Sequence, residues 1–123
     1  MKLSQKEVRG VTVVGVRGKL VGGPDNSDLF HDFFKQLLAE GKKYAVVDLG
    51  RTAWANSQGI GFLIGAYTSV TNAGGDLVLA RVINKIQDIL TVTRLLLIFK
   101  TFEAVDDGVD YLLEKMKGEQ DTG

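Results

Sequence analysis

The chain lacks cysteine entirely, and its 123 residues include one histidine and one proline. Without cysteine there is no disulfide, no thiolate nucleophile and no cysteine-based metal site. The single histidine, His31, has no second imidazole with which to share a metal ion. We therefore expect His31 to be an exposed or half-packed helix residue, and we expect no metal site and no cofactor.

Net charge and long apolar runs are also lacking. Fifteen Lys and Arg balance fifteen Asp and Glu, and the basic residues are scattered without a run of five. Strong attraction to nucleic acid or to an anionic membrane is therefore not expected. The apolar run of residues 11–16 is too short for a signal segment, and no run approaches the roughly 20 residues that span a bilayer. These absences favour a cytoplasmic protein without membrane insertion.

What is present is an alternation of strand-like and helix-like segments. Alternating or β-branched segments predict strands at residues 2–9, 11–17, 44–49, 76–80 and 98–102. Apolar residues at helical spacing predict helices at residues 25–40, 58–73, 83–90 and 106–117. The order predicts one α/β domain over residues 1–117, with a mainly parallel sheet covered by helices. Residues 118–123 are expected to form a flexible tail.

The connections between these segments carry further expectations. Residues 18–25 are predicted to be a loop, after which Asp25, Asn26 or Ser27 caps the first helix. Leu95 and Leu96 are interpreted as the end of a connection before the last strand. Asp106 and Asp107 stand where acidic side chains complement a helix dipole, so a capping role is expected for them.

The segment Asn56-Ser57-Gln58-Gly59-Ile60-Gly61 joins a buried strand to a helix, a place where α/β domains usually carry their function. Its glycines do not make a dinucleotide fingerprint, because Gly65 comes one residue late for G-x-G-x-x-G. Asp76 opens the next strand, whereas a ribose-binding acid would close it. The glycines are instead expected to allow close packing of the helix on the sheet.

Ser57 is the candidate functional residue of this turn. A nucleophilic serine needs a base, and the chain offers one histidine and no G-x-S-x-G elbow, so an enzyme is the least favoured interpretation. The simplest explanation is that Asn56 or Ser57 caps the helix. Phosphorylation is compatible with capping, because a helix N-terminus stabilises a phosphate dianion. Adding that charge would change a docking surface without unfolding the domain.

Phe62 follows the turn and falls away from the apolar stripe formed by Ile60, Leu63 and Tyr67. Two interpretations are open. An exposed Phe62 would be an anchor for a binding partner. Alternatively, it packs on a neighbouring helix.

The chain resembles the STAS domains, in particular bacterial anti-sigma factor antagonists, from about Lys6 to Leu113. The strongest part of the resemblance is Val46-Val47-Asp48-Leu49, a short connection and then Ser57-x-Gly59-Ile60-Gly61-Phe62-Leu63. Weaker matches are Gly18-x-Leu20, Gly74-Gly75 before Leu77-Val78-Leu79, and the apolar segment from Ile86 to Leu95. The resemblance implies a mixed, mainly parallel sheet of about five strands covered by about four helices.

It also implies a phosphoprotein that acts in signal transduction and transcription regulation. Ser57 matches the position that is phosphorylated by a partner serine kinase, which is also the anti-sigma factor, and a phosphatase resets the cycle. The partner supplies the ATP site. The partner-binding residues implied in this chain are Val21, Asn26, Asn56, Gln58, Gly59, Ile60 and Phe62.

The chain departs from the family pattern at several positions. Asn56 and Gln58 replace an acid and a hydroxyl residue on either side of Ser57, Val21 replaces an acid, and Arg94 replaces a glycine. A second hypothesis therefore stays open, a STAS scaffold that is not phosphorylated and belongs to a transporter or signalling assembly. The sequence does not identify the oligomeric state or the partner.

Overall fold

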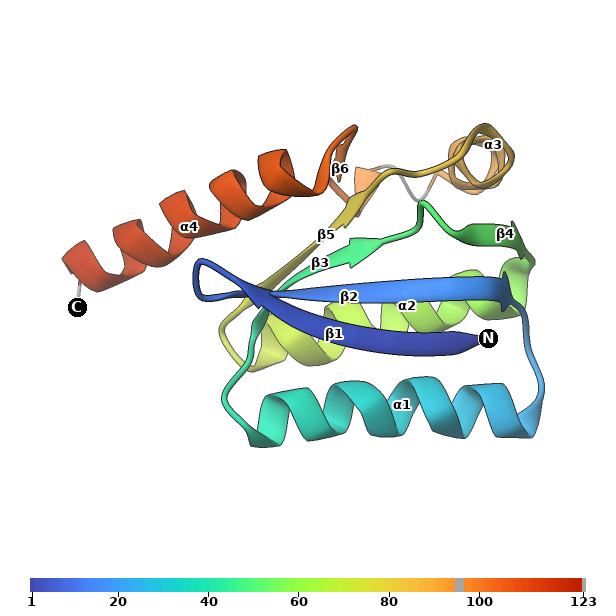
Figure 1. The fold of residues 1–123 in the computed structure, drawn as a ribbon, viewed down its shortest axis with the longest axis horizontal. Helices are drawn as coiled ribbons and strands as arrows, with labels where there is room; N and C mark the ends of the chain where they lie inside the picture. The colour runs from blue at the N-terminus through green and yellow to red at the C-terminus, as the bar shows by residue number, and fades with distance from the viewer. Residues whose placement is uncertain (95–96, 123) are drawn as a thin grey trace.

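The computed structural model describes residues 1–94 and 97–122 and builds them into six strands and four helices (Figure 1). In chain order these are β1 (Lys2–Val8), β2 (Val11–Leu20), α1 (Pro24–Ala39), β3 (Tyr44–Asp48), β4 (Thr52–Ala55), α2 (Ser57–Asn72), β5 (Asp76–Ala80), α3 (Asn84–Val92), β6 (Thr101–Phe102) and α4 (Val105–Thr122).

The strands form one mixed sheet in the order β1-β2-β3-β5-β6, and β4 pairs separately with the end of β2. Strand β1 runs antiparallel to β2 as one arm of a hairpin, whereas the other pairs are parallel. The predicted α/β class and the mixed, mainly parallel sheet are therefore confirmed.

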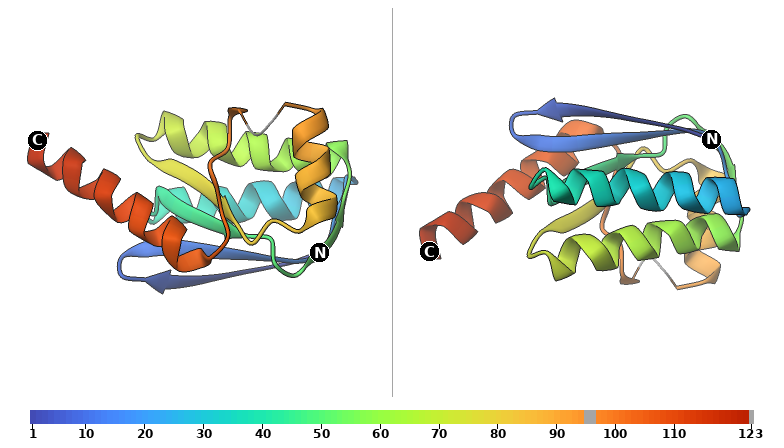
Figure 2. Two further views of the ribbon diagram at one scale, coloured as in Figure 1. Left: turned by 90° about the horizontal axis from the view of Figure 1, so that it is seen from above. Right: turned by 90° about the horizontal axis from the view of Figure 1, so that it is seen from below.

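Helices cover both faces of the sheet. Helices α1 and α2 lie side by side on one face, and α4 crosses the other face (Figure 2). Strand β2 serves both layers because its side chains alternate: Val14 and Val16 join the larger core under α1 and α2, whereas Val11 and Val13 join the smaller core under α4. Burial on both faces is typical of a central strand between helix layers.

Two strands near the turn at Asn56 and Ser57 differ from the sequence prediction. Strand β4 was not predicted, and β2 continues to Leu20 where a loop was expected from residue 18. Gly18 lies inside β2 with a φ of 97°, at the point where the pairing with β4 changes register. The Thr52 hydroxyl donates to the Val16 carbonyl at 2.7 Å, and this long-range pairing holds the extension in place.

Helix α1 also begins differently. It starts at Pro24, after Gly23 with a φ of 118° and no side-chain cap, so the expected caps Asp25, Asn26 and Ser27 lie inside the helix. Proline suits this position because its missing N–H would have no helical partner there.

The C-terminal part differs in two respects. The last strand is confined to Thr101–Phe102 instead of beginning at residue 98, and the expected connection at Leu95 and Leu96 lies outside the described residues. Helix α4 continues through Thr122, so residues 118–122, part of the expected flexible tail, are helical. The flexibility of that segment stays a prediction.

Helix α4 is tied to the sheet by an ion pair in which Lys115 Nζ lies 2.7 Å from Asp76 Oδ2. The other Asp76 oxygen accepts from the Leu77 N–H at 2.8 Å. The hydrogen bond with Asp76 raises the pKa of the Lys115 ammonium above its usual 10.5. Because the folded-state pKa lies above the unfolded value, this stabilisation is complete below pH 10.5 and is lost as the pH rises through the folded-state pKa.

We predict that Lys115→Met lowers the free energy of unfolding at neutral pH by up to about 1 kcal/mol, because half of the lysine side chain is in solvent. Urea denaturation measures the change, and the exposed Lys117→Met is the matched control with no expected effect. The difference between wild type and Lys115→Met should shrink at alkaline pH. Equal stability of the two proteins at neutral pH would argue against a role for the pair.

Candidate functional site

The end of β2, the end of β4 and the start of α2 meet at one end of the sheet, away from the C-terminus (Figure 1). The Asn56 N–H donates to the Leu20 carbonyl at 3.2 Å, which fixes the turn against β2. Asn56 has an extended backbone, and its Oδ1 accepts from the Gly59 N–H at 2.9 Å. Asn56 is therefore the N-cap of α2, as one of the two expected alternatives had it, and Ser57 is the first helical residue.

Gly59 brings α2 into direct contact with β2. A Cβ atom at this position would lie 1.8 Å from the Leu20 carbonyl oxygen, so only glycine fits without a shift of the backbone. The expected packing role is confirmed for Gly59. It is wrong for Gly61 and Gly65, where a Cβ atom would meet nothing within 4 Å.

The Ser57 hydroxyl is available to another molecule. Ser57 and Gln58 are exposed, and the first turn of α2 carries no acidic residue. Backbone N–H groups in a first helical turn have no carbonyl partner within the helix. The Asn56 side chain accepts from the Gly59 N–H. A phosphate on Ser57 would lie close to the remaining unpaired N–H groups of this turn, where the helix dipole also favours negative charge.

The loop between β2 and α1 lies beside this turn. The Gln58 side chain covers Gly22, because a Cβ atom there would lie 1.8 Å from Gln58 Oε1. Asn26 Nδ2 donates to the Val21 carbonyl at 3.2 Å, and both residues are half-buried. The structure thus places the predicted partner-binding residues Val21, Asn26, Asn56 and Gln58 around one turn.

Two other predicted partner-binding residues lie below the surface. Gly59 is buried against Leu20, and Ile60 is 2% exposed in the larger core. In this structure they support the turn from inside. Contact of either residue with a partner stays a prediction.

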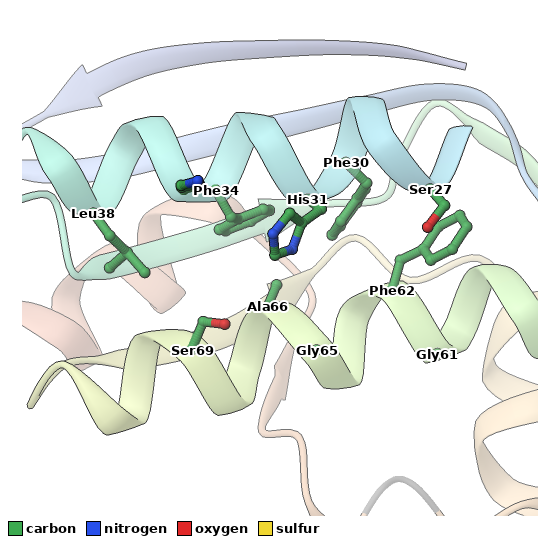
Figure 3. A pocket seen from close by; sticks show the side chains of 11 residues that line it. Ser27, Phe30, His31, Phe34, Leu38, Gly61, Phe62, Gly65, Ala66 and Ser69 are labelled. Atoms are coloured by element: carbon green, nitrogen blue, oxygen red, sulfur yellow. The ribbon is translucent and has the colours of Figure 1, made fainter. Parts of the chain in front are cut away.

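Phe62 packs on the neighbouring helix, which was the second of its two expected placements. It is half-buried, and its ring centroid lies 5.7 Å from that of Phe30 on α1. The two rings stand at one end of a groove of about 570 Å³ between α1 and α2, with Phe34 and Ala66 further along it (Figure 3). His31 is exposed at the rim of this groove, as expected.

Trp54 is a residue that the sequence interpretation missed. It lies on β4, two residues before Asn56, and its side chain is 48% exposed. A large aromatic side chain in solvent next to a candidate docking turn is typical of an interface anchor. The signal in the sequence is the apolar Trp54 between Ala53 and Ala55, which becomes informative once β4 is recognised as an edge strand.

The described residues offer little for other chemistry. Within residues 1–94 and 97–122, no three His, Asp or Glu side chains gather in a way that could hold a metal ion. None of the helices in the same ranges is long and apolar enough to cross a bilayer.

Comparison with known proteins adds the following findings. The family model for the STAS domain matches residues 2–108. Among curated proteins, none matches the chain. An anti-sigma factor antagonist from Mycobacterium paratuberculosis is 18% identical, with a TM-score of 0.77 over 90% of this chain and 92% of that one.

Two further structures have the same fold. The Bacillus cell fate determinant SpoIIAA in its phosphorylated form is 12% identical, with a TM-score of 0.68 over 89% of this chain and 98% of that one. The murine anion transporter Slc26a9 is 16% identical, with a TM-score of 0.68 over 89% of this chain and 18% of the transporter. The chain is therefore similar both to free-standing domains and to one part of a large membrane protein.

Proposed function

Because the chain belongs to the STAS domain family, we propose that it is a regulatory switch of the anti-sigma factor antagonist type. In this proposal it binds a partner serine kinase that is also an anti-sigma factor, and phosphorylation of Ser57 ends that binding. The observation that carries the proposal is the exposed Ser57 hydroxyl at the first position of a capped helix, beside an exposed aromatic side chain.

The surface around Ser57 supports a docking role. Trp54 provides an exposed apolar anchor on β4, and Gln58, which covers Gly22, provides a polar group in the first turn of α2. The aromatic groove between α1 and α2 begins at Gly61 and Phe62, one turn further along α2. A partner seated on Trp54 and Ser57 would therefore reach the mouth of this groove.

The proposal treats the protein as a binding protein and not as an enzyme. Among the described residues, the Ser57 hydroxyl has no hydrogen-bonded base, and His31 lies on α1 at the rim of the groove. The partner would supply ATP, and a phosphatase would reset the switch. The proposed setting is the bacterial cytoplasm.

We predict that the purified protein gains one phosphate, on Ser57, when it is mixed with its partner kinase and ATP. The phosphate adds a charge of about −2 to the docking surface. When the partner returns, this charge must lose its water or is repelled by the partner, so the phosphorylated protein would bind the kinase more weakly. Intact-mass measurement with peptide mapping shows the modification, and Ser57→Ala should gain none. Tight kinase binding with no phosphate transfer, unaffected by Ser57→Ala, would remove the switch from the proposal.

A second candidate is a STAS scaffold that is not phosphorylated. The likeness to one part of Slc26a9 favours it, together with the loss of the family acids at Val21 and Asn56. A stable complex with a protein that has no kinase activity, unchanged by Ser57→Asp, would favour the scaffold over the switch.

A further inference from the structure

Five of the fifteen basic residues, scattered in the sequence, gather on one face of the sheet. We define the basic trough as a hollow of about 480 Å³ along β1, β2 and the end of β3. Its positively charged lining consists of Lys2, Lys6, Arg17, Arg51 and Arg81. All five residues are exposed, and no helix is drawn over the half of the β1–β2 hairpin nearest the N-terminus (Figure 2, left).

The register of the hairpin places like charges opposite each other. Lys2 pairs with Arg17 across β1 and β2, and Lys6 pairs with Val13, which faces the α4 side of the sheet. Like charges in directly opposite positions destabilise a strand pair. An acid in place of Lys2 or Arg17 would make the hairpin more stable. The presence of two positive charges at opposite positions therefore favours a site for an anion between the strands.

The one acid that lines the trough is already engaged. Asp48 Oδ2 lies 3.3 Å from Arg81 Nη1, and Asp48 Oδ1 accepts from the Gly50 N–H at 2.9 Å. Among the described residues, the side chains of Lys2, Lys6, Arg17 and Arg51 have no ion-pair partner. Five positive charges therefore face a single negative charge.

The floor of the trough is polar. Ser4 pairs with Gly15 across β1 and β2, and the Ser4 hydroxyl fills the space over Gly15, where a Cβ atom would lie 2.8 Å from it. Asp48 ends β3 and Arg81 follows β5, so the trough borders the carboxyl edge of the parallel strands, where α/β sheets bind ligands. Its volume lies within the range of small-molecule sites.

We propose that the basic trough binds a compound carrying two or more phosphate groups. The planar guanidinium groups of Arg17, Arg51 and Arg81 match phosphate oxygens in pairs. Lys2 and Lys6 are four residues apart on one strand, about 13 Å, so one phosphate cannot contact both ends. The whole chain is neutral, so the excess of positive charge in the trough is balanced by a net negative charge on the residues outside it. This site is separate from the Ser57 turn and does not depend on the switch.

The test uses tag-free protein and inorganic triphosphate, with calorimetric titration at low and at physiological salt. We expect binding that weakens with salt and that falls at least tenfold in the double variant Arg17→Ala/Arg51→Ala. The control Lys35→Ala/Lys117→Ala removes the same charge from exposed positions outside the trough and should bind as wild type does. Thermal unfolding without ligand should show both double variants folded, since Arg17 and Arg51 support no described contact through their side chains.

Two further probes identify the source of the phosphate. Co-sedimentation with vesicles that contain cardiolipin, whose headgroup carries two phosphates, but not with phosphatidylcholine vesicles, with the same loss in Arg17→Ala/Arg51→Ala, would support a lipid headgroup as the ligand. Binding of triphosphate without binding of vesicles would support a soluble phosphate compound. Binding of neither probe, an equal loss in the control, or equally tight binding of poly-glutamate would overturn the proposal.

Discussion

Replacing Gly59 by alanine is expected to lower the free energy of unfolding by about 3 kcal/mol, at the upper end of the cost of inserting a methyl group into a packed interior. The added Cβ atom would stand 1.8 Å from the Leu20 carbonyl oxygen. That oxygen also accepts the Asn56 N–H, so it cannot retreat without loosening the turn. Helix α2 must move away from β2 instead, and the cap and the exposed Ser57 move with it.

The matched control is Gly61→Ala, two residues further along the same helix. A Cβ atom at Gly61 meets nothing within 4 Å, so alanine is expected to stabilise the helix by roughly 0.5–1 kcal/mol. Chemical denaturation of both variants measures the contrast. Similar effects of the two substitutions would contradict the close approach of α2 to β2.

Replacing Ser57 by aspartate is expected to weaken binding of the partner kinase at least tenfold, or about 1.4 kcal/mol. The substitution puts a permanent negative charge in a helical turn that carries no acidic residue, and the charge must lose its water when the partner docks. Titration of the partner, monitored by calorimetry or surface plasmon resonance, measures the loss.

Ser57→Ala is the matched control for this measurement, because it keeps the site small and neutral. It should bind the kinase within a few-fold of wild type. An aspartate in the first turn of α2 complements the helix dipole, so Ser57→Asp should unfold at the same or a slightly higher temperature than wild type. Unchanged kinase affinity in a folded Ser57→Asp protein would count against the switch.

The framework of the domain could be predicted from the sequence because its signals are local. The β-branched run at residues 11–16 and the apolar stripe from Ile60 to Val70 are typical of a strand and of a helix, and both elements are present. The strand from Asp76 to Ala80 has its predicted bounds. The cap at Asn56 was also foreseen as one alternative, since a small polar residue before a helix is itself a local signal.

The rest depends on contacts between distant residues. Strand β4 has four residues, and its pairing with the end of β2 is what makes it a strand. Gly18 was assigned to a loop because a positive φ inside a paired strand is not visible locally. The exposure of Trp54 and the contact of Phe62 with Phe30 likewise follow from the placement of β4, α1 and α2.

The basic trough illustrates the same limit for charge. Net charge and the absence of basic runs predicted little attraction to polyanions, because both are properties of the linear chain. Residues 2, 6, 17, 51 and 81 share one hollow only through the hairpin register and the crossovers that place β3 beside β2 and β5 beside β3.

The central claim is that Ser57 is the regulated residue, and the most direct measurement is the intact mass of the protein purified from its own cells, followed by mapping of any phosphate. We expect that a fraction of the protein carries one phosphate, on Ser57, and that this fraction changes with growth conditions. A protein that stays unmodified under all conditions, or a phosphate on another residue, would contradict it.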